Sequence, residues 1–489
     1  MGKYSILMAS SEAAPYAKTG GLGDVVSALY QNFKRNGHEI RLILPGYKKI
    51  LEGQWEVEGV LESMCVPMGE GEIWCSVKRV SGTEVYLIQH DNFFSREELY
   101  NDSEYQEYVD NPYRYGFFCR AVLQFAIDTG FSPDIIHVND WQTGVIPAYI
   151  KREFSSHPSF RKTASVLTIH NIAYQGSYHS GIFRWLGLDI NDFNPDVFED
   201  HGKMNFLKGG VAFADMVNTV SPTYAEEVRQ PGGGFGLAPY LTNKGESFCG
   251  ILNGVDYNDW SPWNDSYIKE RYSLKRLEGK AVCKRDMQER MGLKPDPDVP
   301  VIGMISRIVH QKGFDLVRDM IENILHSMSV QFTILGTGER ELENFFSELH
   351  KMYPGRVGVH IGFNNELAHV IEAGSDMFCM PSLFEPCGLN QLYSLKYGAV
   401  PIVRATGGLN DTVVNYDEKR GTGTGFKFYY PGSLALADTI GWAVSTYYDR
   451  PDHFQAVRIE GMNQDFSWKR SAARYLKLYR MALKKKHNE

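Results

Sequence analysis

The sequence predicts an α/β fold of two Rossmann-like, doubly wound domains that face a central cleft. A chain of 489 residues exceeds the size of one ordinary hydrophobic core, so two domains are expected. Short apolar runs alternate with amphipathic segments in two series, which is typical of parallel sheets covered by helices. A glycine-rich turn lies between a strand and a helix in each half of the chain. Two such turns predict two surfaces that face one anionic ligand in a cleft.

We expect the first domain to span residues 1–256. Strands are predicted where short apolar runs occur, at 5–9, 40–44, 85–89, 135–138, 165–169 and 217–220. Helices are predicted where apolar residues recur at helical spacing, at 25–33, 113–127 and 141–150. Because strands and helices alternate, we expect a parallel sheet that is buried on both faces.

A polar, proline-containing stretch without periodicity at residues 257–263 marks the expected domain boundary. The second domain is predicted at residues 257–462. Its strands are expected at 301–305, 332–335, 357–361, 377–381 and 400–403, and its helices at 314–324, 339–351 and 390–397. The last segment, 463–489, contains one predicted helix over 467–483, because its apolar residues follow helical spacing and it ends in lysines.

Composition excludes several classes of protein. The net charge of −8 argues against broad binding of nucleic acid or of an anionic membrane. No apolar run reaches membrane-spanning length, and no leader-like apolar segment follows Met1, so we expect a cytosolic protein without a targeting segment. The seven cysteines form no C-x-x-C pair and predict reduced thiols. No histidine or carboxylate cluster predicts a metal site.

A Lys-Thr-Gly-Gly-Leu-Gly-Asp motif occupies residues 18–24, between a strand and a helix. A glycine turn in this position exposes backbone N–H groups that can receive phosphate, and Lys18 adds a compact positive charge. Its spacing matches neither the dinucleotide fingerprint nor the P-loop. For one isolated turn, a tight connection without a ligand is the simpler interpretation. A second turn, Gly407, Gly408 and Leu409, follows another apolar strand and favours an anion site.

Two cations, Arg307 and Lys312, follow the first strand of the second domain, at the edge of the sheet where ligands bind. Together they can neutralise a diphosphate leaving group. Glu385 lies between a strand and a helix and can accept hydrogen bonds from sugar hydroxyls. The alternative interpretations are a solvated basic loop for the cations and a charge at a helix N-terminus for Glu385.

In the first domain, His170 and Asp140 each follow a predicted strand. Both can face the expected cleft. The alternatives are a hydrogen-bonded structural histidine and an aspartate that serves only as an N-cap.

Taken in order, the motifs resemble those of the bacterial glycogen synthases and plant starch synthases, retaining glycosyltransferases of the GT-B fold. The matching segments are 18–24, 140–141, 168–171, 174–176, 221–224, 253–256, 306–307, 311–313, 385–389 and 406–409. The resemblance covers nearly the whole chain, and the ordered set is highly specific.

This resemblance implies transfer of glucose from ADP-glucose to the non-reducing end of an α-1,4-glucan such as glycogen or a maltooligosaccharide. It implies ADP as product, no further cofactor, and a location in the cytoplasm, or in the plastid stroma for a plant-like source. The segment 463–489 is expected to return to the first domain. Retention without an obvious carboxylate nucleophile favours front-side attack, in which the leaving phosphate helps to take the acceptor proton.

The resemblance also implies roles for individual residues. Lys18 and the amides around Gly20 and Gly21 are expected to contact the donor phosphates. Arg307 and Lys312 are expected to stabilise the charge on the leaving diphosphate. The turn of Gly407, Gly408 and Leu409 is expected to hold glucose and phosphate through backbone N–H groups. The transferred glucose is expected to bind Glu385, His170 and Asn253, with Asp140 nearby.

Some positions depart from the wider pattern. Asn139 and Gln142 stand where many relatives carry histidines, so the family's contacts to the glucan acceptor do not carry over to these two positions. Tyr393 replaces the second glutamate of the wider glycosyltransferase group, as is usual in glycogen and starch synthases. Cys387, beside Glu385, is expected to be a pocket wall, because a nucleophilic thiol requires a depressed pKa.

Three alternatives remain open at this point. The same fold can use UDP-glucose or another acceptor, or the chain can be a catalytically silent glucan-binding protein. Retention of Lys18, His170, Arg307, Lys312 and Glu385 argues against the silent protein, because a pure binder has no need of the diphosphate cations. A dehydrogenase is disfavoured by the spacing of the first glycine turn.

Overall fold

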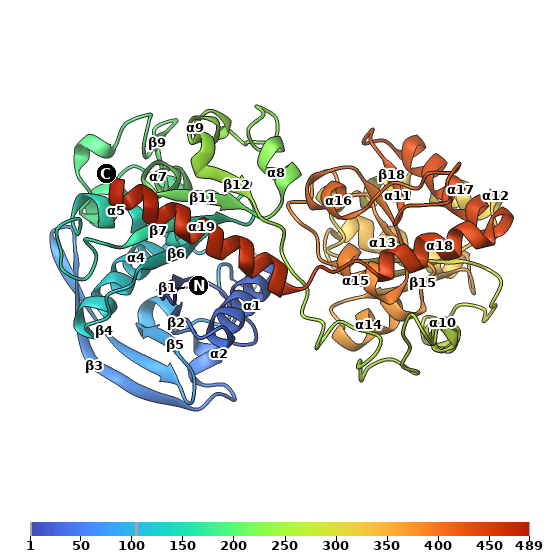
Figure 1. Ribbon diagram of the computed structural model, residues 1–489, viewed down its shortest axis with the longest axis horizontal. Coiled ribbons are helices and arrows are strands. Elements are labelled where there is room, and N and C mark those ends of the chain that lie inside the picture. Colours follow the sequence, from blue (N-terminus) through green and yellow to red (C-terminus); the bar gives the residue numbers. More distant parts are fainter. Residues whose placement is uncertain (1, 103–105, 489) are drawn as a thin grey trace. The chain divides into compact units, whose positions relative to one another are not determined.

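The computed structural model describes residues 2–102 and 106–488. The chain forms two compact units. The first comprises Met1–Val220, Ala225–Ile251 and Trp468–Glu489, and the second comprises Ser221–Tyr224 and Leu252–Ser467. The predicted boundary after Asp256 therefore falls just inside the second unit, and the C-terminal helix α19 (Trp468–Asn488) is part of the first (Figure 1).

The first unit contains a nine-stranded sheet in the order β12-β11-β7-β6-β1-β2-β5-β4-β3. Its strands are β1 (Ser5–Ala9), β2 (Glu39–Pro45), β3 (Val57–Met68), β4 (Gly71–Val80), β5 (Val85–Gln89), β6 (Ile135–Asn139), β7 (Ala164–Ile169), β11 (Met216–Thr219) and β12 (Phe248–Gly250). The six predicted strands are present and pair in parallel. The hairpin of β3 and β4 was not predicted and pairs antiparallel at one edge. A small sheet, β8 (Ser177–His179), β10 (Lys203–Asn205) and β9 (Glu199–Asp200), was also missed.

The helices of the first unit surround this sheet (Figure 1). They are α1 (Gly21–Arg35), α2 (Lys48–Leu51), α3 (Asp91–Phe94), α4 (Asn111–Asp128), α5 (Ile146–Arg152), α6 (Ile182–Leu186), α7 (Phe206–Phe213), α9 (Ala238–Asn243) and α19, and α8 (Pro222–Glu227) lies where the two units meet along the chain. The single helix predicted over 141–150 is wrong. A 3₁₀ turn (Trp141–Thr143) precedes α5, because Pro147 lacks an N–H and fits only the first turn of a helix.

The second unit contains a six-stranded parallel sheet in the order β15-β14-β13-β16-β17-β18. Its strands are β13 (Val301–Ile305), β14 (Gln331–Gly336), β15 (Val357–Ile361), β16 (Met377–Met380), β17 (Val400–Arg404) and β18 (Phe426–Phe428). The predicted strand 377–381 ends one residue earlier, because Pro381 has no N–H to donate.

The helices of the second unit are α10 (Glu278–Arg290), α11 (Phe314–Arg318), α12 (Ile321–Ser327), α13 (Arg340–Met352), α14 (Asn365–Gly374), α15 (Asn390–Tyr397), α16 (Gly407–Thr412), α17 (Ser433–Asp449) and α18 (Pro451–Met462). The one helix predicted over 314–324 is wrong, because the backbone leaves helical geometry at the buried Met320. Within the described ranges, no helix combines the length and apolar character that a bilayer crossing requires.

The central parallel strands of both sheets are buried on their two faces, as predicted. In β1, the consecutive residues Ile6, Leu7 and Met8 are all fully buried. In the second unit, Ile302 and Phe332 belong to one apolar cluster, and Val301 belongs to a separate cluster. Because successive side chains of a strand point to opposite faces, the two clusters are the cores on either side of the sheet.

An aspartate immediately before a strand recurs at the amino edge of both sheets. Each of these carboxylates accepts a hydrogen bond from the first or second N–H of the neighbouring strand. The pairs are Asp134 with Ser5 N (2.9 Å), Asp215 with Ser165 N (2.7 Å) and Asp376 with Val301 N (3.1 Å). Each bond satisfies a strand-end N–H and thereby stabilises the pairing register.

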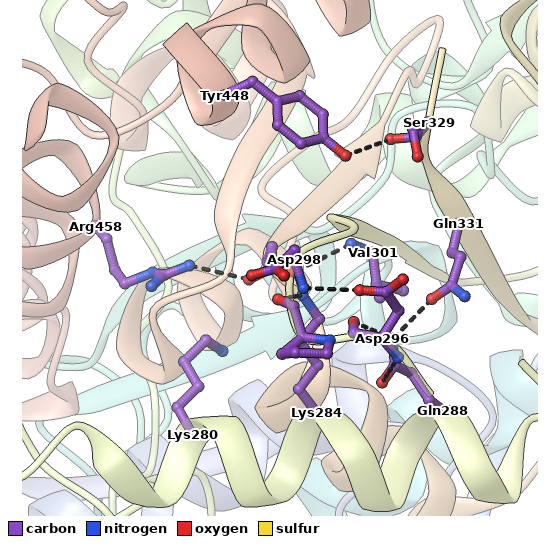
Figure 2. A network of polar contacts seen from close by, with 12 residues as sticks. Lys280, Lys284, Gln288, Asp296, Asp298, Val301, Ser329, Gln331, Tyr448 and Arg458 are labelled. Carbon is purple, nitrogen blue, oxygen red and sulfur yellow. Dashed lines mark hydrogen bonds and ion pairs between the residues drawn. The ribbon is translucent and has the colours of Figure 1, made fainter. Parts of the chain in front are cut away.

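Asp376 is also the centre of a buried charge network. Figure 2 labels Lys280, Lys284 and Arg458 in this region. Its carboxylate binds Lys284 Nζ of α10 at 2.8 Å and Arg458 Nη2 of α18 at 3.1 Å. Lys280, one turn earlier on α10, donates to the carbonyls of Ala373 and Tyr397 at 3.0 Å. Burial lowers the pKa of Lys280 to about 7. This network joins two helices to the amino edge of the sheet, at the opposite edge from the strand ends that carry the predicted site.

A second buried network joins α19 to the first unit. Tyr479 Oη lies 2.8 Å from His137 Nδ1, and the other ring nitrogen of His137 lies 2.7 Å from Thr168 Oγ1. Burial lowers the pKa of His137 to about 3, so the ring is neutral. Tyr475 Oη accepts a further hydrogen bond from Asn218 Nδ2 at 3.3 Å. Near the end of α19, Lys485 Nζ donates to Asp215 O and Ser247 Oγ, so polar groups fix the position of α19 on the first unit.

Replacing Tyr479 by Phe removes the hydroxyl that partners His137 and leaves a buried ring nitrogen unsatisfied. We expect the free energy of unfolding of the first unit to fall by about 1–3 kcal/mol. Calorimetry of the full chain measures this change. Tyr430→Phe is the control, because Tyr430 is 75% exposed and its loss is expected to change nothing. Equal transitions for Tyr479→Phe and the wild type would contradict this role of the network.

Candidate active site

In the first unit, the predicted site residues follow three adjacent strands. The order β7-β6-β1-β2 places β6 between β7 and β1. The chain runs from β1 to β2 on one side and continues with β6 and β7 on the other, so β1 and β6 flank a topological switch point. Ligands of open α/β sheets bind outside the carboxyl ends of strands at such a point. The turn at 18–24 follows β1, Asp140 follows β6, and His170 follows β7.

The glycine turn is organised by a carboxylate that we did not predict. Glu12 is buried and accepts hydrogen bonds from Thr19 N (2.6 Å), Thr19 Oγ1 (2.7 Å) and Gly20 N (3.2 Å). The Gly20 amide already donates to Glu12, so a phosphate would compete with that carboxylate there, and the predicted phosphate contact at Gly20 stays a prediction. A Cβ atom added at Gly20 or Gly21 meets no atom within 4 Å. The space in front of these glycines is open, and a ligand can approach the backbone closely.

Lys18 lies at the start of this turn. Its Nζ atom is 2.8 Å from Asp24 Oδ2 in the first turn of α1, and its side chain is 45% exposed. An exposed pair of this kind contributes little to stability. The ammonium is therefore available to an anionic ligand that competes with Asp24.

Asp140 does not act as an N-cap, so that alternative is wrong: its side chain makes no capping bond to the 3₁₀ turn that follows. Its carboxylate accepts a hydrogen bond from His170 N at 2.7 Å. Burial raises the pKa of Asp140 to about 7, opposed by backbone hydrogen bonds from His170 and Asn171. Its φ of +55° is a strained conformation for a residue with a side chain.

His170 is 9% exposed, and burial lowers its pKa to about 3. Its Nε2 atom lies 3.0 Å from Asn139 Oδ1. The ring is neutral at physiological pH and cannot act as a resident cation for phosphate. It remains available for hydrogen bonding, as expected of a residue that binds a sugar.

The second unit repeats this arrangement. The chain runs from β13 to β14 and β15 on one side and continues with β16, β17 and β18 on the other. Its switch point therefore lies between β13 and β16. Arg307 and Lys312 follow β13, and Glu385 follows β16.

Lys312 and Glu385 form a buried ion pair. Lys312 Nζ lies 2.6 Å from Glu385 Oε2, and Ser382 Oγ donates to the same oxygen at 3.0 Å. Glu385 is only 5% exposed. The helix α15 has Leu389 as its N-cap, so the alternatives of a solvated basic loop for Lys312 and a helix-end charge for Glu385 are both wrong.

Arg307 is exposed, and no hydrogen bond or ion pair of its guanidinium joins it to another residue in the described ranges. The guanidinium carries five donors in a planar fork that suits phosphate oxygens. The Arg307 fork, five residues before the partly buried Lys312, provides a second cation after the same strand.

The second glycine turn packs against the segment that carries Glu385. A Cβ atom at Gly407, whose φ is +42°, meets Glu385 O at 1.9 Å, and one at Gly408 meets Cys387 O at 2.0 Å. Gly408 N donates to Glu385 O (3.2 Å) and Pro386 O (3.3 Å). The Gly408 amide is thus already used within the chain, and its predicted role as a ligand contact stays a prediction. Leu409 is fully buried and anchors the turn in the core.

Asn253 and Cys387 lie beside this turn. Asn253 is buried, and among the described residues its Oδ1 atom has no hydrogen-bond partner. An unpaired buried acceptor is costly and is suited to a hydroxyl of a bound ligand. Burial raises the pKa of the Cys387 thiol to about 12. A thiol with a raised pKa is a poor nucleophile at neutral pH, and the role of Cys387 as a pocket wall stays a prediction.

Sequence reasoning missed Glu12, Ser382 and Arg404. Arg404 donates from Nε to Ser382 O at 2.8 Å and from Nη2 to Leu383 O. The signal for Glu12 was a carboxylate between a strand and a glycine turn. No comparable signal marked Ser382 or Arg404, whose roles depend on contacts with distant segments. Across residues 2–102 and 106–488, no three histidine, cysteine or acidic side chains gather in a way that could hold a metal ion.

The two halves of the chain match two families of known proteins. Residues 5–243 match the family described as starch synthase catalytic domain, and residues 287–453 match glycosyl transferases group 1. The chain is 43% identical to glycogen synthase 1 of Geobacter metallireducens, over 100% of this chain and 98% of the relative. It is 42% identical to glycogen synthase of Treponema denticola, over 98% and 99%.

Solved structures agree with these matches. The catalytic domain of starch synthase IV from Arabidopsis thaliana, bound to ADP and acarbose, aligns with a TM-score of 0.90 and 32% identity, over 99% of this chain and 100% of that chain. A sucrose-phosphate synthase from Thermosynechococcus elongatus aligns with a TM-score of 0.61 at 17% identity, over 98% of both chains, which supports the fold alone. The predicted GT-B fold is confirmed by these similarities.

The raised pKa of Asp140 predicts a pH-dependent stability. The unfolded carboxyl ionises near pH 4, whereas the folded one keeps its proton to about pH 7. The folded state therefore binds more protons in this window, and the free energy of unfolding falls as pH rises through it. We expect Asp140→Asn to abolish this fall. Between pH 4 and pH 7, the free energy of unfolding of the variant should therefore rise relative to that of the wild type by up to about 4 kcal/mol.

Calorimetry of the two proteins across this pH range measures the gain. Asp438→Asn, at an exposed position, is the control and is expected to follow the wild-type profile. Parallel profiles for Asp140→Asn and the wild type would show that the folded carboxyl ionises normally.

Proposed function

We propose that this chain, which belongs to the glycogen and starch synthase family of glycosyltransferases, transfers glucose from ADP-glucose to the non-reducing end of an α-1,4-glucan. The observation that carries the proposal is the Lys312–Glu385 ion pair, whose lysine follows the same strand, β13, as the exposed Arg307. Two cations with one carboxylate at a switch point suit a ligand that has both a diphosphate and a sugar. The bacterial relatives favour a cytoplasmic location, which we include in the proposal.

The donor is proposed to be a nucleoside diphosphate sugar with adenine as its base. The starch synthase IV relative was solved with ADP and acarbose, which supports this choice and a glucan acceptor. Arg307 and Lys312 would neutralise the charge that grows on the diphosphate as the glycosidic bond breaks. No further cofactor is part of the proposal, and ADP is the product.

The sugar is proposed to bind the buried polar groups of the site. Glu385 keeps one oxygen for a hydroxyl while the other accepts from Lys312 and Ser382. Asn253 Oδ1 supplies an unpaired acceptor. In the first unit, His170 would bind the sugar, and Lys18 and the Gly21 amide would bind phosphate.

The second glycine turn contributes differently from what the sequence predicted. Gly407 and Gly408 bring the chain against the Glu385 segment, so they would shape the site. Of that turn, the Leu409 amide remains our proposed phosphate contact.

Retention is proposed to occur by front-side attack. Glu385 is held by Lys312 and Ser382, and Asp140 has a pKa raised to about 7 by burial, so neither resembles a free nucleophilic carboxylate. The transition state gains positive charge at the sugar and negative charge at the diphosphate. A phosphate oxygen of the leaving group would take the acceptor proton, and fixed cations then contribute more than a strong base.

We expect the full chain to transfer glucose from ADP-glucose to glycogen, and UDP-glucose to be a poorer donor. Arg307→Met is expected to lower kcat by about 100- to 1000-fold, because it removes one charge from the leaving group, with little loss of stability since Arg307 has no partner to abandon. Arg285→Met, at a 76% exposed site, is the matched control.

Radiolabelled glucose incorporation measures both effects. Transfer from UDP-glucose alone would correct the donor. Glycogen binding without transfer from either donor would overturn the proposal in favour of a silent glucan-binding protein.

We expect the new linkage to be α-1,4 and no covalent glucosyl-enzyme to form. Proton NMR of the product shows the anomeric configuration, and mass spectrometry of the intact chain during turnover detects any added hexose. Glu385→Gln tests the same point, because a slowed second step would accumulate an ester on the remaining carboxylate. A glucosyl ester on Asp140 or Glu385 would contradict front-side attack.

A further inference from the structure

We propose that Asn139 is a positioning residue that holds His170 in the tautomer with its hydrogen on Nε2, leaving Nδ1 as a hydrogen-bond acceptor for a sugar hydroxyl. This inference rests on the proposed role of His170 in binding the transferred glucose. Asn139 is the last residue of β6 and is fully buried. It lies between β1 and β7, at the switch point of the first unit.

The orientation of the Asn139 amide follows from its neighbour on β1. Asn139 Nδ2 donates to the backbone carbonyl of Ala9 at 3.1 Å. A carbonyl oxygen only accepts, so the amide nitrogen must face Ala9. The amide oxygen then faces the opposite direction, toward His170.

The tautomer of His170 follows from that orientation. Asn139 Oδ1 lies 3.0 Å from His170 Nε2, and an amide oxygen has no hydrogen to give. His170 Nε2 must therefore be the donor. The neutral ring carries only one hydrogen, since burial keeps its pKa near 3. Nδ1 consequently retains its lone pair.

Both residues are fixed at the backbone as well. Asn139 N donates to Thr143 Oγ1 at 2.7 Å, and that hydroxyl donates back to Asn139 O at 2.8 Å. His170 N donates to Asp140 Oδ1 at 2.7 Å. A flip of the amide would lose the hydrogen bond to the Ala9 carbonyl and set two acceptor oxygens against each other.

The consequence is a neutral sugar contact of fixed polarity. A ring locked with Nδ1 as acceptor binds a hydroxyl that donates, and it cannot itself donate from that atom. A histidine at position 139 can present a donor or an acceptor, and it would not impose one tautomer on His170. Asparagine at this position therefore sets the direction of a hydrogen bond to the ligand.

The test uses the full chain labelled with 15N-histidine. Long-range proton–nitrogen NMR distinguishes the protonated from the unprotonated ring nitrogen, and the His170 signals are those that His170→Gln removes. We expect Nε2 to be protonated in the wild type. Asn139→Leu, which removes the acceptor, is expected to lose this preference and to lower kcat/KM by about tenfold, the size of one hydrogen bond.

Asn139→Asp is the conservative variant. A carboxyl at this site still offers an acceptor to Nε2–H, and if protonated it can donate to Ala9 O, so we expect the tautomer and most of the activity to be retained. Calorimetry confirms that each variant is folded. A merely structural role for Asn139 would move stability without changing the tautomer of folded Asn139→Leu.

Hydrogen on Nδ1 in the wild type, or an unchanged tautomer in Asn139→Leu, would overturn the inference. The NMR reading does not depend on turnover. The expected tautomers in a chain without glucosyl transfer would sustain the positioning role and overturn the proposed function, so the two failures are distinguishable.

Discussion

Parallel strand pairing is the constraint on which the rest of this structure depends. It brings all carboxyl ends of a sheet to one edge and all amino ends to the other. In each unit the direction of strand addition reverses once, between β1 and β6 and between β13 and β16. The candidate site residues follow the strands at these two points. The amino edges carry aspartates that secure the neighbouring strand, as Asp376 does for Val301. The charges that stabilise the sheet thus lie at the amino ends of the strands, and the charges of the candidate site lie at the carboxyl ends.

Buried carboxylates in the candidate site meet the cost of desolvation in three ways. Glu12 accepts backbone and hydroxyl hydrogens of the glycine turn. Glu385 is paired with the Lys312 ammonium and the Ser382 hydroxyl. Asp140 has backbone donors alone, and burial raises its pKa to about 7. Burial of an unpaired charge is expensive, so each solution limits the chemistry that remains. Only Glu385 combines a resident cation with an oxygen left for a ligand.

The strands and the strand-end residues could be predicted from the sequence, whereas the partners of those residues could not. Apolar runs such as 301–305 report burial directly, and the observed β13 has the same bounds. The hairpin of β3 and β4 gave no such signal, because its residues alternate between burial and exposure along long, irregular strands. The Lys312–Glu385 pair joins positions that are 73 residues apart. Such a contact depends on two strands lying side by side, which local patterns do not encode.

The two glycine turns also show that a local sequence pattern does not reveal the contacts of its residues. In sequence they share a Gly-Gly-Leu core between a strand and a helix, and both were predicted to bind phosphate through backbone N–H groups. In the structure, Gly20 and Gly21 border open space, whereas Gly407 and Gly408 have carbonyl oxygens where a Cβ atom would lie. The packing of the chain does not require glycine at the first pair, and the open space is compatible with the proposed phosphate contact there. The second pair is glycine because the Glu385 segment lies against it. The same Gly-Gly-Leu sequence therefore occurs for two different physical reasons. The two cases are distinguished only by the atoms that surround each backbone.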